Sequence, residues 1–517
     1  MIFFRYPLLL LCIFSSVYAQ TDPRLTTWLT SNSTKYARVT ETTTTSPVAT
    51  WPSVGIPKNA MSPTQDAPAY ADVQQILYSN NYVYVKSADL ASHRMGPWYK
   101  EYTKTTVNGL WPQNRALTSK IPRNPVAGTG LVQVAQGPVG VMVNGVTIAN
   151  LGDGSGYNTS LARDGGITGG GVPGNQSNVW IRCATGAEGP ILDAGFGHPA
   201  PDGGYHYHAN PRALRYQLGD NLTYNAVSDS YTENTTNLRH SPIIGWAYDG
   251  YPIYGPYAYS IANDATSPVR RMVSGHVPRD GQYGTSNLNT AGRKSLAPWA
   301  AFFHTFTTTL ASVDYSLAST SWGPDVSASF PLGWYAEDFD YLGDRVKTPA
   351  TGAKYFQGVD FDLDKPNGRQ CVTPEFPGGT YAYFIPIDVV GAPAFPFSIG
   401  RYWRGVSNGG RVVNGNITEA VTTLFTGGPA VPVSWSNSPS VDKVSGNVTL
   451  SWRSVEGGSY LMETSTTLQS WSTLNPAVPA ASSATQTSYL HSSNSDRRFY
   501  RVSRSALAPF DPAYTGQ

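Results

Sequence analysis

Three of the eight histidines of the chain lie within eleven positions of one another, in the stretch "GHPAPDGGYHYHANP" (residues 197–211). They are His198, His206 and His208. Imidazole nitrogens are common ligands of zinc and copper, which hold them at about 2 Å. Three imidazoles are therefore a candidate metal site, provided that the chain folds so that their rings meet.

Strand geometry predicts that the three histidines share one face of a hairpin. Successive side chains of a strand point to opposite faces, so His206 and His208 share one face and the tyrosines that precede them share the other. A turn of odd length, with residues 202–204 at its tip, puts His198 opposite His208. A turn of even length would put His198 on the tyrosine face, so the predicted copper or zinc site depends on the register of this hairpin.

The histidine stretch has two alternative interpretations. The rings could stack or cap within an aromatic surface, because His-x-His pairs also occur in cores and at sheet edges. A cupin site also begins with His-x-His, but no glutamate follows here at a short interval, in "ANPRALRYQ" (209–217). The spacing of three histidines favours a metal site over both alternatives.

The histidine hairpin belongs to a region of short strands, and the sequence predicts a mainly β fold. In "VGVMVNGVTIAN" (139–150), a central Asn-Gly pair suits the two positive φ angles of a type I′ turn. In "IIGWAYDGYPIYG" (243–255), an Asp-Gly pair repeats the pattern, and "GGTYAYFIPIDVV" (378–390) is a further strand. The one modest helix candidate is 298–310.

The first nineteen residues have the form of a signal peptide. Arg5 precedes the apolar run "PLLLLCIF", and Val17 and Ala19 are the small residues expected before a cleavage site. This run is too short to span a bilayer, and no later run approaches the roughly 20 apolar residues of a transmembrane helix. We expect residues 1–19 to be removed and the protein to be secreted, into the periplasm, onto the cell surface or outside the cell.

The charge and composition exclude some classes of partner. The formal net charge is +2, and the lysines and arginines are scattered rather than clustered. We therefore expect no nucleic-acid partner and no attraction to an anionic membrane surface. Only 14% of the residues are charged, whereas glycine, proline and tyrosine are abundant, a balance typical of turn-rich β proteins.

The 517 residues are too many for one compact core, so several domains are expected. Residues 20–67 are rich in Thr, Ser and Pro and are predicted to be a leader or linker. The predicted remainder is a hairpin-rich domain at 68–405, a linker at 406–431, a small β-sandwich at 432–505 and a tail at 506–517. The sandwich resembles the C-terminal fibronectin- or immunoglobulin-like modules of exported bacterial proteins, in "SYLMETSTTLQSWSTL" and "RFYRV". Such modules serve as spacers or surface-association domains.

Motifs spread over about residues 70–405 resemble those of the YHYH-domain proteins. They are Tyr205-His206-Tyr207-His208 with "GHP" before it, "SADLASHRMGPW", "GVMVNGV", "GWAYDGYPIYGPY" and "TPEFPGGTYAYF". The resemblance implies membership of that family, which has no established activity to carry over. Many members have cysteines beside the histidine motif, whereas this chain has none there. We therefore expect neither a local disulfide nor a cysteine ligand at the motif.

Three further polar residues are outer candidates for the site. His93 and His240 lie in motifs shared with the family and could reach the site if the chain folds back. Asp249 is expected to be the first residue of a hairpin turn. As a carboxylate near the histidines it could alternatively orient one of their rings.

Without the signal peptide, Cys183 and Cys371 are the remaining cysteines. In an oxidising compartment two cysteines can pair in one way, so we predict a disulfide between them. The alternative is two separate buried thiols.

The sequence also suggests a calcium site in "DFDLDKPNG" (360–368). Asp360, Asp362 and Asp364 alternate as in a calcium loop, but Lys365 stands where an EF-hand has glycine and Cys371 where it has glutamate. A solvated acidic loop is the favoured alternative.

Two functions are consistent with these features. The first is a secreted metalloprotein in which the three histidines bind copper, suited to redox chemistry with the nearby tyrosines, or zinc, suited to hydrolysis. The second is a non-catalytic surface or adhesion protein. In it, aromatic hairpins present a face for a polysaccharide and the C-terminal sandwich acts as a tether.

Overall fold

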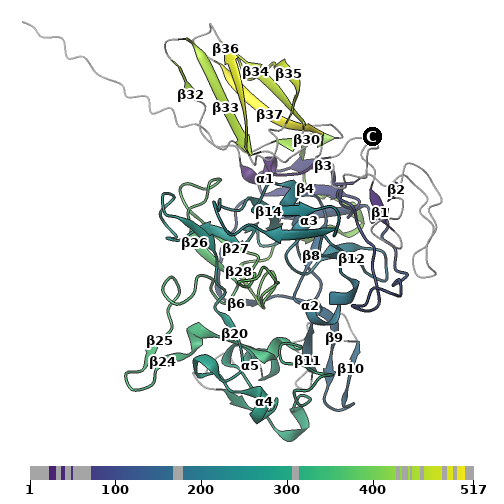
Figure 1. The fold of residues 1–517 in the computed structure, drawn as a ribbon, viewed down its shortest axis with the longest axis vertical. Helices are drawn as coiled ribbons and strands as arrows, with labels where there is room; N and C mark the ends of the chain where they lie inside the picture. The colour runs from purple at the N-terminus through teal and green to yellow at the C-terminus, as the bar shows by residue number, and fades with distance from the viewer. Residues whose placement is uncertain are drawn as a thin grey trace, which may run out of the picture.

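The computed structural model describes most of the chain. The described residues are 22–30, 37–40, 48–50, 71–166, 179–305, 314–426, 431–432, 440–442, 445–453, 459–479, 486–492 and 498–506. The predicted signal peptide lies outside them, as does all but the first residue of the predicted tail. Strands predominate and the helices are short, which confirms the mainly β fold (Figure 1). No helix among the described residues is long and apolar enough to cross a membrane.

An eight-stranded mixed sheet lies at the centre of the molecule and has the histidine hairpin at one edge. In spatial order its strands are β12 (Gly197–Pro199), β13 (Tyr205–Tyr207), β8 (Thr147–Ala149), β7 (Pro138–Met142), β16 (Ile243–Ala247), β17 (Pro252–Tyr254), β27 (Thr380–Phe384) and β26 (Gly368–Cys371). The β13–β8 and β17–β27 pairs are parallel. All five residues of the central strand β16 are buried, so both faces of the sheet lie in the core at this strand.

The turn between β7 and β8 differs from the predicted type I′ turn. Only Gly145 has a positive φ, of 78°, and Asn144 does not. The N–H of Gly145 donates to Met142 O, and that of Met142 to Val146 O. This pattern is a type I turn followed by a left-handed glycine, another common hairpin closure. The Asn144 side chain stabilises it, since its Oδ1 accepts from the Val146 N–H and its Nδ2 donates to the Tyr207 hydroxyl.

A five-stranded sheet joins segments from both ends of the central domain. Its strands, in spatial order, are β29 (Gly410–Arg411), β5 (Leu117–Pro122), β4 (Tyr82–Ser87), β3 (Val73–Tyr78) and β30 (Thr422–Thr426). The outer two, β29 and β30, fall within the residues predicted to be a linker. They are short and largely exposed, and neither has the alternation of apolar and polar residues that would identify it as a strand.

Part of the predicted leader also packs into this domain. It contains the short helix α1 (Pro23–Thr26), and the following Trp28 and Leu29 are fully buried. The Leu29 N–H donates to Val143 O, and the Arg24 guanidinium lies 5.0 Å from the centroid of the Trp246 ring. The neighbouring residues are rich in threonine, so the composition of the segment gave no sign that residues 23–29 pack against the central domain.

A second core lies at the opposite end of the molecule from the C-terminal strands (Figure 1). It includes residues of the sheet β10–β9–β11 (Arg163–Gly166, Gly152–Asn158 and Val179–Cys183) and of α5 (Pro298–Thr305). The helix confirms the prediction for 298–310, whose last residues lie outside the described part.

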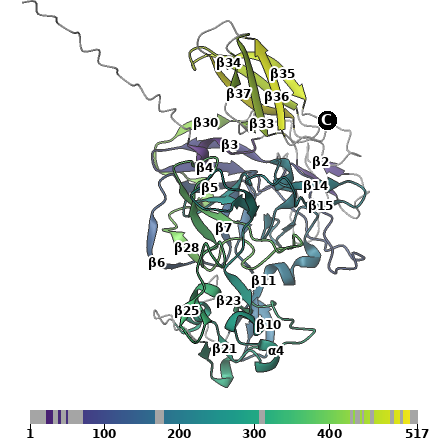
Figure 2. The same cartoon turned by 60° about the vertical axis from the view of Figure 1, so that its left-hand side comes forward.

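The C-terminal strands form two facing sheets with a core of their own (Figure 2). One sheet contains β31 (Val431–Pro432), β37 (Phe499–Ala506), β34 (Ser459–Ser465) and β35 (Ser472–Pro479). The other contains β32 (Ser440–Val441), β33 (Asn447–Arg453) and β36 (Gln486–Ser492). Trp452, Tyr460 and Met462 are buried between them. A small sandwich is therefore present, and its kinship to fibronectin-like modules stays a prediction.

The predicted disulfide between Cys183 and Cys371 is wrong, because both are free, buried thiols. Cys183 ends β11 in the second core, whereas Cys371 ends β26 in the core of the central sheet. Burial raises the pKa of both thiols, so they stay protonated and pack as small apolar side chains. Counting cysteines could not show that the two belong to different cores.

Asp89 provides a test of how burial affects stability. It is fully buried, and its Oδ1 accepts from the Thr147 N–H of β8 at 2.8 Å. Burial raises the pKa of this carboxyl to about 6, although Arg411 opposes the shift. The unfolded value is about 3.9, so the fold favours the neutral acid, and that contribution is lost as the pH rises through about 6.

Asp89→Asn should therefore stabilise the domain by about 2–3 kcal/mol at pH 7.5 and by about 1 kcal/mol at pH 4.5. Thermal unfolding at the two pH values measures this, with the exposed Asp325→Asn as the control. An equal gain at both pH values would contradict the prediction.

Candidate metal centre

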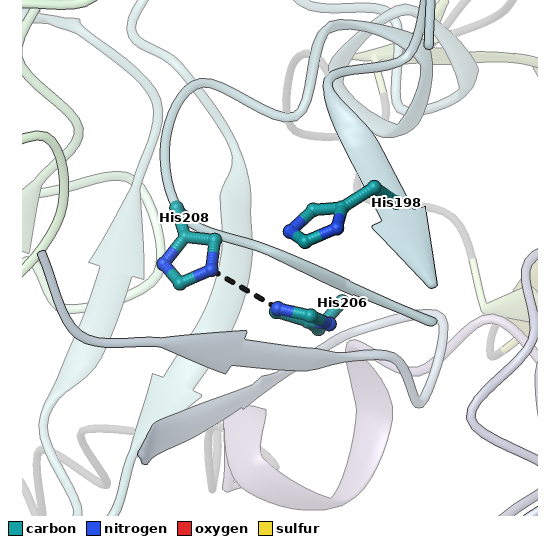
Figure 3. A group of neighbouring side chains, drawn as sticks. All are labelled: His198, His206 and His208. Atoms are coloured by element: carbon teal, nitrogen blue, oxygen red, sulfur yellow. Dashed lines mark hydrogen bonds between the residues drawn. The ribbon is translucent and has the colours of Figure 1, made fainter. Parts of the chain in front are cut away.

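The histidine stretch forms the hairpin β12–β13. His198 pairs with His206, and Gly197 pairs with Tyr207. The loop at 200–204 has an odd length, as predicted, but its tip lies one residue earlier, so His198 is opposite His206 rather than His208. The residue paired with His198 therefore differs from the predicted one by two positions. Because the side chains of a strand alternate between its faces, a shift of two positions leaves every side chain on its predicted face. The three imidazoles therefore lie on one side of the hairpin (Figure 3).

The three rings are close enough to share one ion. The ring centroids of His198 and His206 lie 4.3 Å apart, those of His206 and His208 4.8 Å, and those of His198 and His208 5.5 Å. One nitrogen from each ring can be chosen so that all three lie within 4.8 Å of one another. His198 and His208 are buried, whereas His206 is partly exposed.

Two backbone carbonyls determine which nitrogens are available. The Nδ1 of His206 lies 3.0 Å from Gly204 O, and the Nδ1 of His208 lies 2.7 Å from Asn150 O, just after β8. A carbonyl oxygen can only accept, so each Nδ1 carries a proton, and in the neutral form of each ring the Nε2 has a free lone pair. These two Nε2 atoms face each other at 3.0 Å, as the dashed line in Figure 3 shows. Two lone pairs repel at that distance unless a proton or a cation lies between them.

Glu188, which the sequence analysis missed, completes the cluster. Its Oε2 lies 3.2 Å from the Nε2 of His198 and 3.1 Å from the Nε2 of His208. It lies between α2 (Ala184–Ala187) and the 3₁₀ helix η2 (Gly189–Ile191). In the sequence Glu188 is an isolated glutamate in "ATGAEGP", ten residues before His198. The cupin pattern places its glutamate after the histidines, so that pattern could not identify Glu188.

The electrostatics of the cluster suit a cation. Burial would raise the pKa of Glu188, but the imidazoles of His208 and His198 outweigh burial and hold this pKa well below its usual range. Burial and the two neighbouring imidazoles lower the pKa of His206 well below its usual value. The site therefore offers an ionised carboxylate beside a neutral imidazole. For His208, burial lowers the pKa, but Glu188 more than compensates and the net shift is upward.

The sequence model of the YHYH protein family matches residues 118–394, which are more than half of the chain. The chain belongs to the YHYH protein family. No curated protein and no solved structure matched the chain. The matched residues begin in β5 and end after β27, so they include both the YHYH motif and Glu188.

The two tyrosines of the YHYH motif anchor β13 from its other face. The Tyr207 hydroxyl lies 2.7 Å from the Nε2 of His93, whose Nδ1 faces Arg94 O at 2.9 Å. The Tyr205 hydroxyl donates to Asp193 Oδ2 at 2.9 Å. His93, an outer candidate from the sequence, therefore supports the strand from behind and is not in the cluster of three histidines.

The other two outer candidates of the YHYH domain also have partners elsewhere. The Nδ1 of His240 faces Ser241 O at 2.8 Å, and its ring packs edge-on against Tyr254. Asp249 occupies the turn between β16 and β17, where its Oδ2 accepts from the Tyr383 hydroxyl at 2.6 Å and from the Gly405 N–H at 3.0 Å. Neither residue is in the histidine cluster.

The loop considered for calcium uses its carboxylates for other contacts. A calcium loop requires its carboxylates to converge on one ion. Here each has its own partner: Asp360 pairs with Lys347, Asp362 with Arg270, and Asp364 accepts from the Tyr381 hydroxyl. The described contacts give the calcium prediction no support.

Proposed function

We propose that this YHYH protein binds one transition-metal ion, copper or zinc, through the Nε2 atoms of His198, His206 and His208, with Glu188 as a fourth ligand. The observation that carries the proposal is the 3.0 Å approach of two Nε2 atoms whose rings both have their Nδ1 facing a carbonyl. Metal-binding histidines have this arrangement, in which the second nitrogen donates to a carbonyl or carboxylate.

Three imidazoles and a carboxylate are a ligand set that suits both metals. A bound ion would supply Lewis-acid chemistry if it is zinc, or redox chemistry if it is copper. The chain contributes by orienting the rings, through Gly204 O and Asn150 O, and by leaving access beside the partly exposed His206. We also propose that the protein is exported, on the strength of the signal-like residues 1–19.

Metal analysis of the purified protein tests this function. The protein is prepared without a polyhistidine tag, and its metals are measured by mass spectrometry before and after chelation and reloading. We expect about one equivalent of copper or zinc per chain. A folded protein that neither carries nor takes up a metal would refute the proposal. One equivalent of iron or manganese would support the proposed site but show that copper and zinc are the wrong metals.

Glu188→Gln tests whether the carboxylate is a ligand. The change keeps the shape of the side chain but removes its charge, so metal affinity should fall about tenfold or more. Competition with a chromophoric chelator measures the affinity. The control is Glu463→Gln, because that glutamate pairs with Arg501 in the C-terminal sandwich, far from the histidines in the sequence. An unchanged affinity would leave the three histidines as the ligand set.

A further inference from the structure

A groove of about 910 Å³ borders the segment that carries Glu188. This volume is near the upper end of the roughly 300–1,000 Å³ range of ligand pockets. Ala187 and Gly189, on either side of Glu188, both line it. The walls come from separate parts of the chain, with lining residues in 97–104, 185–196, 228–231, 331–339 and 393–397 and at Arg212.

Aromatic rings and hydroxyl groups form much of the lining. The rings include Tyr102, Phe196 and Trp334. Tyr102 is 71% exposed, so its ring is available for stacking. The hydroxyl-bearing residues Thr185 and Ser230 also line the groove. Flat apolar faces interspersed with hydrogen-bonding groups suit a ligand that itself has apolar faces and hydroxylated edges.

The groove lining also contains two cations besides its two carboxylates. Lys104 and Arg212 line it, and neither forms an ion pair with a carboxylate among the described residues. Arg212 donates to Gly391 O, and its guanidinium lies 4.1 Å from the centroid of the Phe196 ring.

The two carboxylates of the lining are already engaged. Asp193 is buried and accepts from Tyr205 and from the backbone N–H of Gly197. Asp229 forms an ion pair with Arg94. Lys104 and Arg212 are therefore the lining cations that can pair with an anionic ligand, and the buried Asp193 adds one negative charge to the lining.

We propose that this groove binds an acidic carbohydrate chain, that is, sugar rings bearing carboxylates. The apolar faces of the sugars stack on the aromatic side chains, and their hydroxyls bond to the serine and threonine hydroxyls. Their carboxylates pair with Arg212 and Lys104. A neutral sugar would leave both cations unpaired, and a peptide whose side chains are all carboxylates would offer no apolar ring face to stack on the aromatic side chains. The inference goes beyond the metal site and does not depend on it.

Calorimetry with three hexamers tests the inference, first on metal-free and then on metal-loaded protein. Hexagalacturonate is the acidic sugar, cellohexaose the neutral sugar and hexaglutamate the acidic chain without rings. We expect hexagalacturonate to bind with or without metal, and at least about tenfold more tightly than either of the others. Its affinity should fall as the salt concentration rises.

Two exposed side chains of the groove can be removed with little risk to the fold. Tyr102→Ala and Lys104→Gln should each weaken hexagalacturonate binding about five- to tenfold. The matched controls are Tyr283→Ala and Lys354→Gln, because that tyrosine is 49% exposed, that lysine is exposed, and neither lines the groove. The controls should bind like the unmodified protein.

Three results would overturn the inference: no binding of hexagalacturonate to the folded protein, equal binding of cellohexaose or hexaglutamate, or groove variants that behave like the controls. Because binding is first measured on metal-free protein, each of these outcomes leaves the metal proposal standing. Conversely, a protein that binds hexagalacturonate but no metal would refute the metal site alone.

Discussion

The double variant His206→Ala, His208→Ala should bind its metal at least about 1,000-fold more weakly than the unmodified protein. A structural zinc site with four ligands has an apparent binding free energy of about 10–16 kcal/mol, and this variant loses two of the four proposed ligands. The metal content of the purified protein should fall from about one equivalent to nearly none. Mass spectrometry measures the content, and chelator competition measures the affinity.

Single variants at other histidines test whether the lower metal affinity of the double variant comes from the missing ligands or from unfolding. His240→Ala removes a buried ring outside the cluster, and His491→Ala removes a ring in the C-terminal sandwich. Both should retain the metal. Circular dichroism and the melting temperature show whether each variant is folded. Normal metal affinity in a folded double variant would refute the proposed site.

Gly197→Ala should both destabilise the domain and weaken the metal site. A Cβ at this position would lie 2.2 Å from the Tyr205 hydroxyl oxygen and 2.3 Å from its Cζ. The Tyr205 ring is fully buried and its hydroxyl is bonded to Asp193, so it has no free space to move into. We expect a loss of about 2–4 kcal/mol of unfolding free energy, from overpacking and the disturbed hydrogen bond. A displaced β12 would also move His198 away from His206.

Thermal unfolding and metal titration measure the two effects of Gly197→Ala. The control is Gly165→Ala, a strand glycine of β10 with no atom within 4 Å of an added Cβ. Adding Tyr205→Val to Gly197→Ala removes the obstructing ring, so this pair should be less unstable than the sum of the two single changes. A Gly197→Ala protein as stable as the control would show that β12 can adjust without cost.

The amino-acid sequence by itself determined the local features of this protein. The Tyr-His-Tyr-His alternation places His206 and His208 on one face, because the side chains of a strand repeat every two residues. An odd loop then brings His198 to the same face, even though its tip lies one residue from the predicted position. The β7–β8 hairpin was predictable for the same reason, since an Asn-Gly pair between β-rich runs is a local signal.

Only the tertiary structure decided which distant segments meet. Glu188 reaches the histidines from the segment between α2 and η2, and His93 meets Tyr207 from a loop more than one hundred residues earlier. The central domain also includes β29, β30 and the buried Trp28, which lie in segments that the sequence predicts to be linkers. Cys183 and Cys371 lie in separate cores. Such contacts depend on packing between segments far apart in the chain, which leaves no periodic pattern in either segment alone.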